Sequence, residues 1–552
     1  MSIIPTMEAT TIVRIAQGAL KGLKSRTHLG VPFYSFRGIP YARAPVGDLR
    51  FKAPEKAEQW KGIRNAIGMP PTAPQMAFLT DNLYTGEEDC LFINVFTPSI
   101  GEGQGLKPVL VYIHGGGFFM GSGNDQMHGP GRFMNTSAVV LVTFNYRLGV
   151  LGFLSTADSV LPGNNGLKDQ TMALRWVRDN IEEFGGDPNN VTIAGVSAGA
   201  LCTHLHVFSP MSKGLFHKAI VQSGSALSPW AARHPDNARR RAFRFGKVLG
   251  LDTDNSEELV KQLKKISARR LVEASEAAHL IEEKHPFPML FQPVLEKEDS
   301  ETEAFLPEWP LHVLRSPAYT AVPMITGVTS REGLFFLKDV SASSAWYESM
   351  NDDNFDNLLY VHLNLRKGTP ETRKLTRKVV QHYFGDKRIS KDTWSNLLDV
   401  YGDVLFSVWV AKTAKEHGSL DVEVPLYVYQ FAFDGRFGLN RDHGRRFAGV
   451  AHAADLGYLF ETSFNPIHYF NKEDASMRTS RRMIKLWVNF AETGNPTPDT
   501  DDEDLGGVTW LPYSRTEPYY FIIGQDLAMG KDFNTDTLDF WYSLPIPDVP
   551  QM

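Results

Sequence analysis

Cysteine is the scarcest feature of this sequence, with only Cys90 and Cys202 among 552 residues. Two thiols can form at most one disulfide, so the fold does not depend on a disulfide framework. They are also too few for a zinc site built from cysteines. Stability must come from a packed apolar core, which a chain of this length can supply.

Long apolar runs are also missing. No stretch approaches the ~18 apolar residues that a membrane-spanning helix needs. Residues 1–10 have neither the basic start nor the apolar centre of a signal peptide, and residues 548–552 carry no retention, peroxisomal or prenylation signal. We therefore expect a cytoplasmic protein.

Charge is balanced, with 57 Lys and Arg against 63 Asp and Glu and a net charge of −6. No block of like charge is present, so neither nucleic acid nor an acidic membrane surface is expected as a partner. The length alone suggests several domains of about 100–200 residues. No Pro-rich or Gly/Ser-rich linker divides the chain, however.

One short stretch gives the first indication of chemistry: Gly195-Val196-Ser197-Ala198-Gly199. The apolar run before it predicts a buried strand, and the run after it has the length and content of a helix. Glycines on both sides of a serine relieve the cramped backbone of a direct strand-to-helix turn. The pattern is typical of a nucleophile elbow, which raises the hydroxyl at the end of the strand above a helix N-terminus. A Gly-rich turn without chemistry is the alternative.

A second glycine-rich stretch, His114–Phe118, follows an apolar strand expected over 108–113. Three consecutive glycines are unfavourable in a helix or strand and are typical of backbone that approaches something closely. Their N–H groups are suited to binding an oxyanion, with a flexible turn as the alternative.

The remaining apolar segments alternate between strand and helix. Strands are also expected over 138–146, 191–194, 219–224, 321–327, 425–431 and 518–523, the last as an edge strand, and helices over 166–184, 200–208 and 476–493. This alternation predicts an open, mostly parallel sheet. Ligands bind such sheets at the carboxyl ends of the strands, where the glycine stretch and Ser197 both fall.

Six stretches resemble, in order, the signatures of the type-B carboxylesterase family, the esterase and cholinesterase branch of the α/β hydrolases. They are residues 36–51, 88–95, 114–118, 195–199, 329–333 and 449–460. The resemblance implies the α/β class and an α/β-hydrolase fold: a central, mostly parallel sheet flanked by helices, with helical cap insertions that form a gorge. It also implies one domain over 10–545, with short tails at 1–9 and 546–552.

The resemblance further implies a catalytic triad. A serine hydroxyl needs a base to take its proton, and a carboxylate fixes the tautomer of that base. In α/β hydrolases the acid and then the histidine follow the serine. Ser197 is then the nucleophile, Glu332 the acid and His452 the base. His443, in a charged loop, is the weaker rival for the base.

Supporting residues follow from the same resemblance. Gly116, Gly117 and Ala198 are expected to donate their backbone N–H groups to the oxyanion, and His114 to hold the glycine loop. Ser223 is expected beside the triad, although an ordinary turn serine fits equally well.

The sequence departs from the family pattern at several positions. Arg331 stands where the family usually has Asp, next to the predicted acid, so we expect its charge to tune the site. Asp455 replaces the more common Glu. Ala73 lies where secreted members have the disulfide partner of Cys90, so this thiol is expected to be reduced and buried. The choline-stacking Trp of cholinesterase-like members is missing; Thr80 and Tyr84 lie in that neighbourhood, which is unfavourable for a quaternary ammonium substrate.

The implied function is hydrolysis of a carboxylic ester through an acyl-enzyme, without a cofactor or a metal ion. His204 and His206, at i and i+2 of a helix, cannot face one metal ion. Aromatic stretches near 286–294 suggest a neutral, fairly hydrophobic ester. A transacylase or lactone-forming enzyme, a carbamate or amide hydrolase, and a non-catalytic binding protein remain alternatives, and the oligomeric state stays open.

Overall fold

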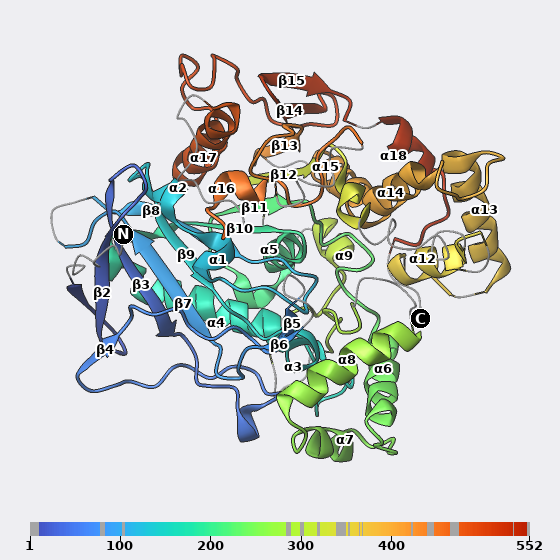
Figure 1. The fold of residues 1–552 in the computed structure, drawn as a ribbon, viewed down its shortest axis with the longest axis horizontal. Coiled ribbons are helices and arrows are strands. Elements are labelled where there is room, and N and C mark those ends of the chain that lie inside the picture. The colour runs from blue at the N-terminus through green and yellow to red at the C-terminus, as the bar shows by residue number, and fades with distance from the viewer. Residues whose placement is uncertain are drawn as a thin grey trace, which may run out of the picture.

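A 13-stranded sheet crosses the centre of the computed structural model (Figure 1). Its order is β1-β2-β3-β7-β9-β8-β10-β11-β12-β13-β14-β15, and β4 pairs with β2. Neighbouring strands from β9 to β14 are parallel, whereas β1 to β3, β7 and β15 pair antiparallel at the two sides. The expected mostly parallel sheet is confirmed.

The structure describes residues 10–77, 83–101, 105–282, 289–297, 303–316, 319, 321–337, 349–351, 354–363, 365–366, 368–420, 423–438, 447–463, 474–533 and 535–548. The strands of the central sheet are β1 (Thr10–Ile15), β2 (Gly18–Arg26), β3 (Pro32–Pro40), β4 (Ile63–Asn65), β7 (Phe92–Thr97), β8 (Lys107–Ile113), β9 (Val140–Phe144), β10 (Gly186–Val196), β11 (Lys218–Gln222), β12 (Met324–Thr329), β13 (Leu426–Phe431), β14 (Tyr519–Ile523) and β15 (Leu527–Lys531). A separate antiparallel pair consists of β5 (Gln75–Ala77) and β6 (Leu83–Thr85).

The helices lie mostly between these strands and after β11. They are α1 (Asp125–His128), α2 (Gly131–Met134), α3 (Gly149–Phe153), α4 (Asn165–Asn180), α5 (Ala198–Phe208), α6 (Pro235–Val248), α7 (Ser256–Leu263), α8 (Ala268–Glu282), α9 (Pro310–Leu314), α12 (Asn354–His362), α13 (Pro370–Phe384), α14 (Trp394–Gly402), α15 (Val408–His417), α16 (Leu456–Leu459), α17 (Ala475–Thr493) and α18 (Thr535–Tyr542). Short 3₁₀ segments occur at Gly47–Leu49, Ile181–Phe184, Pro210–Ser212 and Glu332–Phe336, and a π-helical turn at Asp403–Ser407.

Side chains on alternate positions of the central strands enter two different cores. On β8, Val109, Val111 and Ile113 pack in the core that also contains apolar residues of α4 and α5. Leu110 and Tyr112 belong to the second core, with the buried face of α17. This period of two places helices on both faces of the sheet, which explains why β8 is apolar almost throughout.

The predicted position of one strand in the sheet was wrong. The segment over 518–523 was expected at an edge, but β14 lies between β13 and β15 and forms a hairpin with β15. β15 is five residues long, contains a glycine and has no β-branched or aromatic residue, so its sequence alone does not indicate a strand, and it forms one by pairing with β14.

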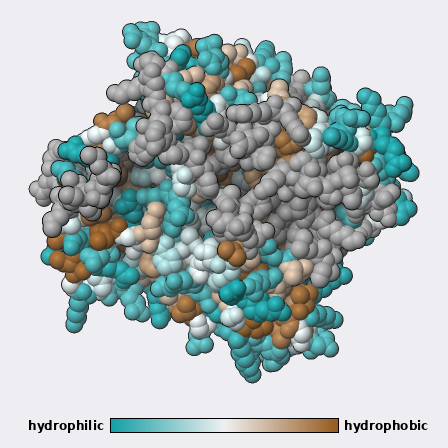
Figure 2. All heavy atoms as spheres, viewed as in Figure 1, coloured by the Kyte–Doolittle hydropathy of each residue, from teal (hydrophilic) through white to brown (hydrophobic). Residues whose placement is uncertain are grey.

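Two groups of helices extend from the sheet. Figure 1 shows α6, α7 and α8 together at one end of the molecule, and α12, α13, α14 and α18 at another. In the view of Figure 2 the coloured surface is largely hydrophilic, with apolar residues scattered in small groups. In the part of the chain that the structure describes, no helix has the combined length and apolarity required to cross a membrane.

Candidate active site

The elbow at Ser197 lies at the carboxyl end of β10. Ser197 has φ 59° and ψ −127°, and α5 begins at the next residue. This conformation is strained for a residue with a side chain and is typical of functional turns. A Cβ at Gly199 would collide with the carbonyl oxygen of Ile113, and one at Gly195 would lie 2.5 Å from the carbonyl of Gly199. The two glycines are therefore required for the direct turn from strand into helix.

The glycine loop after β8 lies against this elbow. A Cβ at Gly115 would lie 2.6 Å from the carbonyl oxygen of Val196 and 3.3 Å from Cβ of Ser197. Gly116 and Gly117 have φ of 112° and 60°, which glycine adopts readily. The strand order places β8 next to β10, so both loops leave the sheet at the same edge.

Three backbone amides near Ser197 are available for an oxygen atom. Among the described residues, no hydrogen bond is made by the N–H groups of Gly116, Gly117 and Ala198. Ala198 is the first residue of α5, so its N–H has no partner within the helix and points along the positive end of the helix dipole. These are the properties required of an oxyanion hole.

His114 holds the glycine loop from behind, as expected. Its Nδ1 is 2.8 Å from the carbonyl oxygen of Gly115, and its ring stacks on Tyr146 with centroids 4.3 Å apart. The Tyr146 hydroxyl donates to the carbonyl oxygen of His114 at 2.9 Å. Burial lowers the pKa of His114 to about 4, so the ring is neutral at pH 7.

Glu332 begins the 3₁₀ turn after β12, two strands from β10. Its side chain is buried, and Oε2 lies 2.6 Å from Nδ1 of His452. Its other oxygen, Oε1, accepts from the Ser223 hydroxyl at 2.6 Å and from the Thr329 N–H at 2.7 Å. Three donors thus fix a carboxylate that water does not reach, and the hydroxyl of Ser223 is one of them.

His452 is 3% exposed and lies in a loop before α16. A carboxylate oxygen only accepts, so Nδ1 of His452 carries the proton that Glu332 binds, which leaves Nε2 without one in the neutral ring. Nε2 is buried and has no hydrogen-bond partner among the described residues. No direct hydrogen bond joins it to the Ser197 hydroxyl there, a separation common in enzymes without substrate.

The strand order explains how these residues come together. Ser197, Ser223 and Glu332 follow the adjacent parallel strands β10, β11 and β12. The N–H of Ser197 donates to the carbonyl oxygen of Gln222 at 2.9 Å, directly before Ser223. A chain of contacts therefore runs from the elbow through the end of β11 to Glu332 and His452.

Aromatic rings surround the histidine. Phe406 stacks on His452 with centroids 3.9 Å apart and a 19° angle, and Phe335 meets it edge-on at 5.5 Å. Trp230 contacts Phe406 and also Phe118, which follows the glycine loop. The site is therefore apolar on the side of the base, which favours neutral groups near the reacting atoms.

The structure shows the contacts of the residues that depart from the family pattern. Asp455 is buried and accepts from Nε2 of Gln222 at 2.9 Å and from the Tyr429 hydroxyl at 3.0 Å, and burial raises its pKa. Arg331 pairs with Asp399, and no ion pair joins it to Glu332 among the described residues. Cys90 is free and buried, as expected.

The other histidines singled out from the sequence have structural partners or cannot be placed. His204 Nδ1 accepts from the N–H of Ala226 at 3.0 Å, and His206 contacts Gln170 and Ser212 through its two ring nitrogens. Within the described ranges, no cluster of three or more potential metal ligands occurs. His443 and Thr80 lie outside the described residues.

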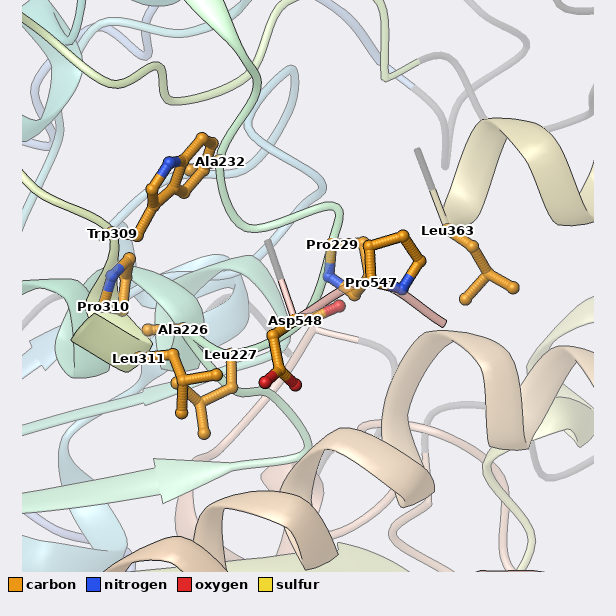
Figure 3. Close-up of a pocket in the computed structure, with 11 residues that line it drawn as sticks. Ala226, Leu227, Pro229, Ala232, Trp309, Pro310, Leu311, Leu363, Pro547 and Asp548 are labelled. Carbon is orange, nitrogen blue, oxygen red and sulfur yellow. The ribbon is translucent and has the colours of Figure 1, made fainter. Parts of the chain in front are cut away.

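Two hollows lie near the site, although neither is lined by Ser197 or His452. One, of about 390 Å³, lies between α8 and the glycine loop; its apolar wall includes Phe119, Val150 and Phe291. The other, of about 400 Å³, lies under the loop after β11, where Pro547 and Asp548 face Leu227 and Pro229 (Figure 3). The first is lined by Phe119, two residues after Gly117 of the glycine loop.

Sequence reasoning missed several residues at the site. Phe406 lies in the π-helical turn Asp403–Ser407, and Asp399 lies in α14, directly before it. Thr329 contributes only a backbone N–H. No motif marks these residues, because their roles depend on contacts between segments far apart in the chain.

Comparison with known proteins agrees with this geometry. The model of the Carboxylesterase family matches residues 9–541. The chain belongs to the carboxylesterase family. This is a family of carboxylic ester hydrolases, and the resemblance inferred from the motifs is confirmed.

Relatives of this carboxylesterase-family chain cover most of its length. It is 37% identical to "Juvenile hormone esterase" of Tribolium castaneum, over 84% of this chain and 80% of that protein. It is 30% identical to "Neuroligin-2" of Mus musculus, over 97% of this chain and 68% of that protein. The crystal structure of juvenile hormone esterase from Manduca sexta with OTFP covalently attached superposes with a TM-score of 0.86 at 29% identity, covering 97% of this chain and 99% of that one. The α/β-hydrolase fold is thereby confirmed.

Proposed function

We propose that this chain hydrolyses a neutral, fairly hydrophobic carboxylic ester through an acyl-enzyme on Ser197. The observation that carries this proposal is the buried hydrogen bond of 2.6 Å between Glu332 and His452, at the same sheet edge as the strained elbow. A buried carboxylate–imidazole pair beside a serine on a nucleophile elbow is the arrangement of a serine hydrolase.

In the proposed first step, Nε2 of His452 takes the proton of the Ser197 hydroxyl while Oγ attacks the ester carbonyl carbon. The carbonyl oxygen becomes an oxyanion, which the N–H groups of Gly116, Gly117 and Ala198 bind. Each such donor is worth about 3 kcal/mol of transition-state stabilisation. The protonated His452 then gives its proton to the leaving alcohol, and the acyl group stays on Ser197.

In the second step a water molecule replaces the alcohol. His452 removes a proton from the water, which attacks the acyl carbonyl carbon, and His452 then gives this proton to Oγ of Ser197 as the acyl–Oγ bond breaks and the carboxylic acid leaves. Glu332 keeps the imidazole in one tautomer and stabilises its protonated form throughout.

The substrate class follows from the surroundings of the reacting atoms. Phe406 and Phe335 enclose His452, and the hollow beside Phe119 is apolar. Burying a charged group there would be costly, whereas apolar acyl or alcohol groups gain about 25 cal/mol per Å² buried. A cytoplasmic location also remains a prediction.

Ester hydrolysis by the purified full chain tests the proposal. p-Nitrophenyl acetate, butyrate and octanoate are compared for the wild type and for Ser197→Ala. We expect turnover by the wild type and a loss of about 10⁴-fold or more in Ser197→Ala. Equal, slow rates for both proteins would contradict the proposal and favour a binding role, as would the absence of acyl-enzyme formation. Transfer of the acyl group to an added alcohol faster than to water would instead identify a transacylase.

A further inference from the structure

We propose that Arg331 is a positioning residue, which orients the Glu332–His452 pair by fastening both segments to α14. This inference rests on the proposed hydrolase function. Arg331 directly precedes Glu332, but its guanidinium is directed to α14 and not to this carboxylate. Nε of Arg331 lies 2.7 Å from Oδ1 of Asp399, and Nη2 lies 3.0 Å from Oδ2. Two parallel bonds to one carboxylate fix direction as well as distance.

The same guanidinium binds α14 at a second point and also binds the histidine loop. Nη2 donates to the Ser395 hydroxyl at 2.6 Å, one turn of α14 before Asp399. Nη1 donates to the carbonyl oxygen of Ala448 at 3.3 Å, four residues before His452. The backbone N–H of Arg331 donates to the carbonyl oxygen of Val450 at 3.0 Å. One side chain and its own amide therefore join three segments: the acid turn, α14 and the histidine loop.

The histidine loop is shaped to accept this side chain. Gly449 has φ 115°, and a Cβ there would lie 2.6 Å from Cβ of Arg331. Only glycine allows the loop to pass so close in this conformation. The ring of Phe447 lies 5.6 Å from the guanidinium carbon, within the range of a cation–π contact. The Arg331 side chain therefore packs between α14 and the loop that precedes His452, and 20% of it is exposed.

The far end of the same helical unit touches the imidazole itself. After α14 the chain continues without a break into the π-helical turn Asp403–Ser407 and then α15. Phe406 of this turn stacks on His452. The turn is fixed in place by Trp230, whose Nε1 donates to the carbonyl oxygen of Leu405 at 2.8 Å. A Cβ at Gly333 would collide with the carbonyl oxygen of Leu398, so α14 lies directly on the acid turn.

These contacts give Arg331 a role that its position beside Glu332 does not by itself suggest. Its charge is bound to Asp399 on α14, so it does not serve as an ion-pair partner of the acid. Arg331 instead binds the backbone just before His452, and Phe406 stacks on the His452 ring. Both contacts join the histidine segment to the continuous helical unit of α14 and the π-helical turn. Loss of the two hydrogen bonds from Arg331 to Asp399 is expected to let the histidine loop and the His452 ring move. A smaller fraction of molecules would then have Nε2 of His452 directed at the Ser197 hydroxyl.

Steady-state hydrolysis of p-nitrophenyl butyrate by the full chain tests this role. Arg331→Met and Asp399→Asn are each expected to lower kcat by about 10-fold while KM changes less than about 3-fold, because the oriented ring acts only in the transition state. The kcat of the double variant is expected to match that of each single variant within about 3-fold, because Arg331→Met and Asp399→Asn remove the same Arg331–Asp399 interaction. Arg331→Lys keeps the charge but not the fork, and its kcat is expected to lie between those of the wild type and Arg331→Met.

Arg315→Met is the matched control. Arg315 also forms a two-point ion pair, with Glu416 at 3.0 and 2.6 Å, and its Nη1 lies 3.4 Å from Oδ2 of Asp548; among the described residues it makes no hydrogen bond or ion pair with Glu332, Asp399 or His452. Its kcat is expected to stay within about 2-fold of the wild type, and thermal unfolding of every variant checks that the fold is retained. If Arg331→Met does not fold, Asp399→Asn and Arg331→Lys decide.

The proposal is overturned if Asp399→Asn and Arg331→Met keep wild-type kcat, or if the two losses multiply in the double variant. A wild-type kcat for Arg331→Lys beside a low one for Arg331→Met would show that charge, not position, matters, and would also overturn it. These outcomes require that Ser197→Ala is inactive and the wild type active. If that comparison fails instead, the proposed hydrolase function is wrong, and the result is distinct from a failure at Arg331.

Discussion

Two regions of the molecule meet at His452, and they hold it in different ways. At the sheet edge, Glu332 binds it and Ser223 in turn donates to Glu332, through short, fully buried hydrogen bonds from residues that follow adjacent parallel strands. On the helical side, α14 and the π-helical turn reach it through one stacked ring and a partly exposed ion pair. Buried bonds to a carboxylate are worth more than exposed pairs, so the sheet edge should tolerate less change.

Removal of the histidine tests the point where both regions meet and should have the largest effect. His452→Ala is expected to lower kcat for p-nitrophenyl butyrate by about 10⁴-fold or more, because it removes the base proposed to take the serine proton. His312→Ala, at an exposed histidine with 52% of its side chain accessible, is the control and should keep its activity. Substantial turnover by His452→Ala would mean that another base acts.

A substitution at the elbow tests whether the close approach of backbone segments at the sheet edge requires glycine. In Gly199→Ala the new Cβ would collide with the carbonyl oxygen of Ile113, which belongs to a central strand and cannot move aside. The free energy of unfolding is expected to fall by about 3 kcal/mol or more, measured by urea denaturation. Gly68→Ala, at a glycine with no atom within 4 Å of its added Cβ, should change stability little. Equal stabilities for both variants would refute this account of the elbow.

A single supporting bond at the sheet edge should matter less. Ser223→Ala removes one of the three donors to Glu332, and the loss of a hydrogen bond to a charged group costs about 1.5–3 kcal/mol. We expect kcat to fall about 10-fold while Ser197 remains reactive. Ser225→Ala is a close control, because Ser225 bonds to Thr413 of α15 and not to Glu332. A larger effect at Ser225 than at Ser223 would reverse the comparison between the two regions.

The helical region contains a buried carboxyl group, Asp403, which should make the stability of the protein depend on pH. Burial raises the pKa of Asp403 from its ordinary value of 3.8 to about 7, and Tyr383 donates to its carboxylate at 2.6 Å. Between pH 4 and 7, Asp403 therefore keeps its proton in the folded state but has lost it in the unfolded chain. The contribution of this proton to the free energy of unfolding is fully present at low pH and is lost as the pH rises through 7. Thermal unfolding of the wild type at pH 6 and 8 should show this fall, and Asp403→Asn should show a smaller one. An identical slope in both proteins would exclude Asp403 as the cause.

The difference between the two regions also explains what the sequence could predict. The elbow and the glycine loop need glycines at fixed positions, because a Cβ at Gly199 or Gly115 would meet backbone. Such requirements leave a local pattern, so the mostly parallel sheet and the glycine loop and serine at the carboxyl ends of its strands could be inferred from short stretches of sequence. Glu332 and His452 needed the family resemblance, because nothing local distinguishes them from other acids and histidines.

The helical region leaves no comparable pattern. The pairing of Arg331 with Asp399 joins segments 68 positions apart, and either residue alone reads as a surface charge. From its place beside Glu332, the charge of Arg331 is expected to tune the site, and in the structure this charge is bound to Asp399 of α14. The position of Phe406 depends on a π-helical turn, which the apolar spacing of α14 and α15 does not reveal. Contacts of this kind arise from tertiary packing and become visible only in the structure.

The central claim is that Ser197 is a nucleophile activated by His452. The most direct test treats the full chain with a fluorophosphonate and maps the modified residue by peptide mass spectrometry, in the wild type and in His452→Ala. We predict rapid modification of Ser197 alone in the wild type and labelling at least about 10³-fold slower in His452→Ala. Modification of another residue, or equal labelling of Ser197 in both proteins, would contradict the claim.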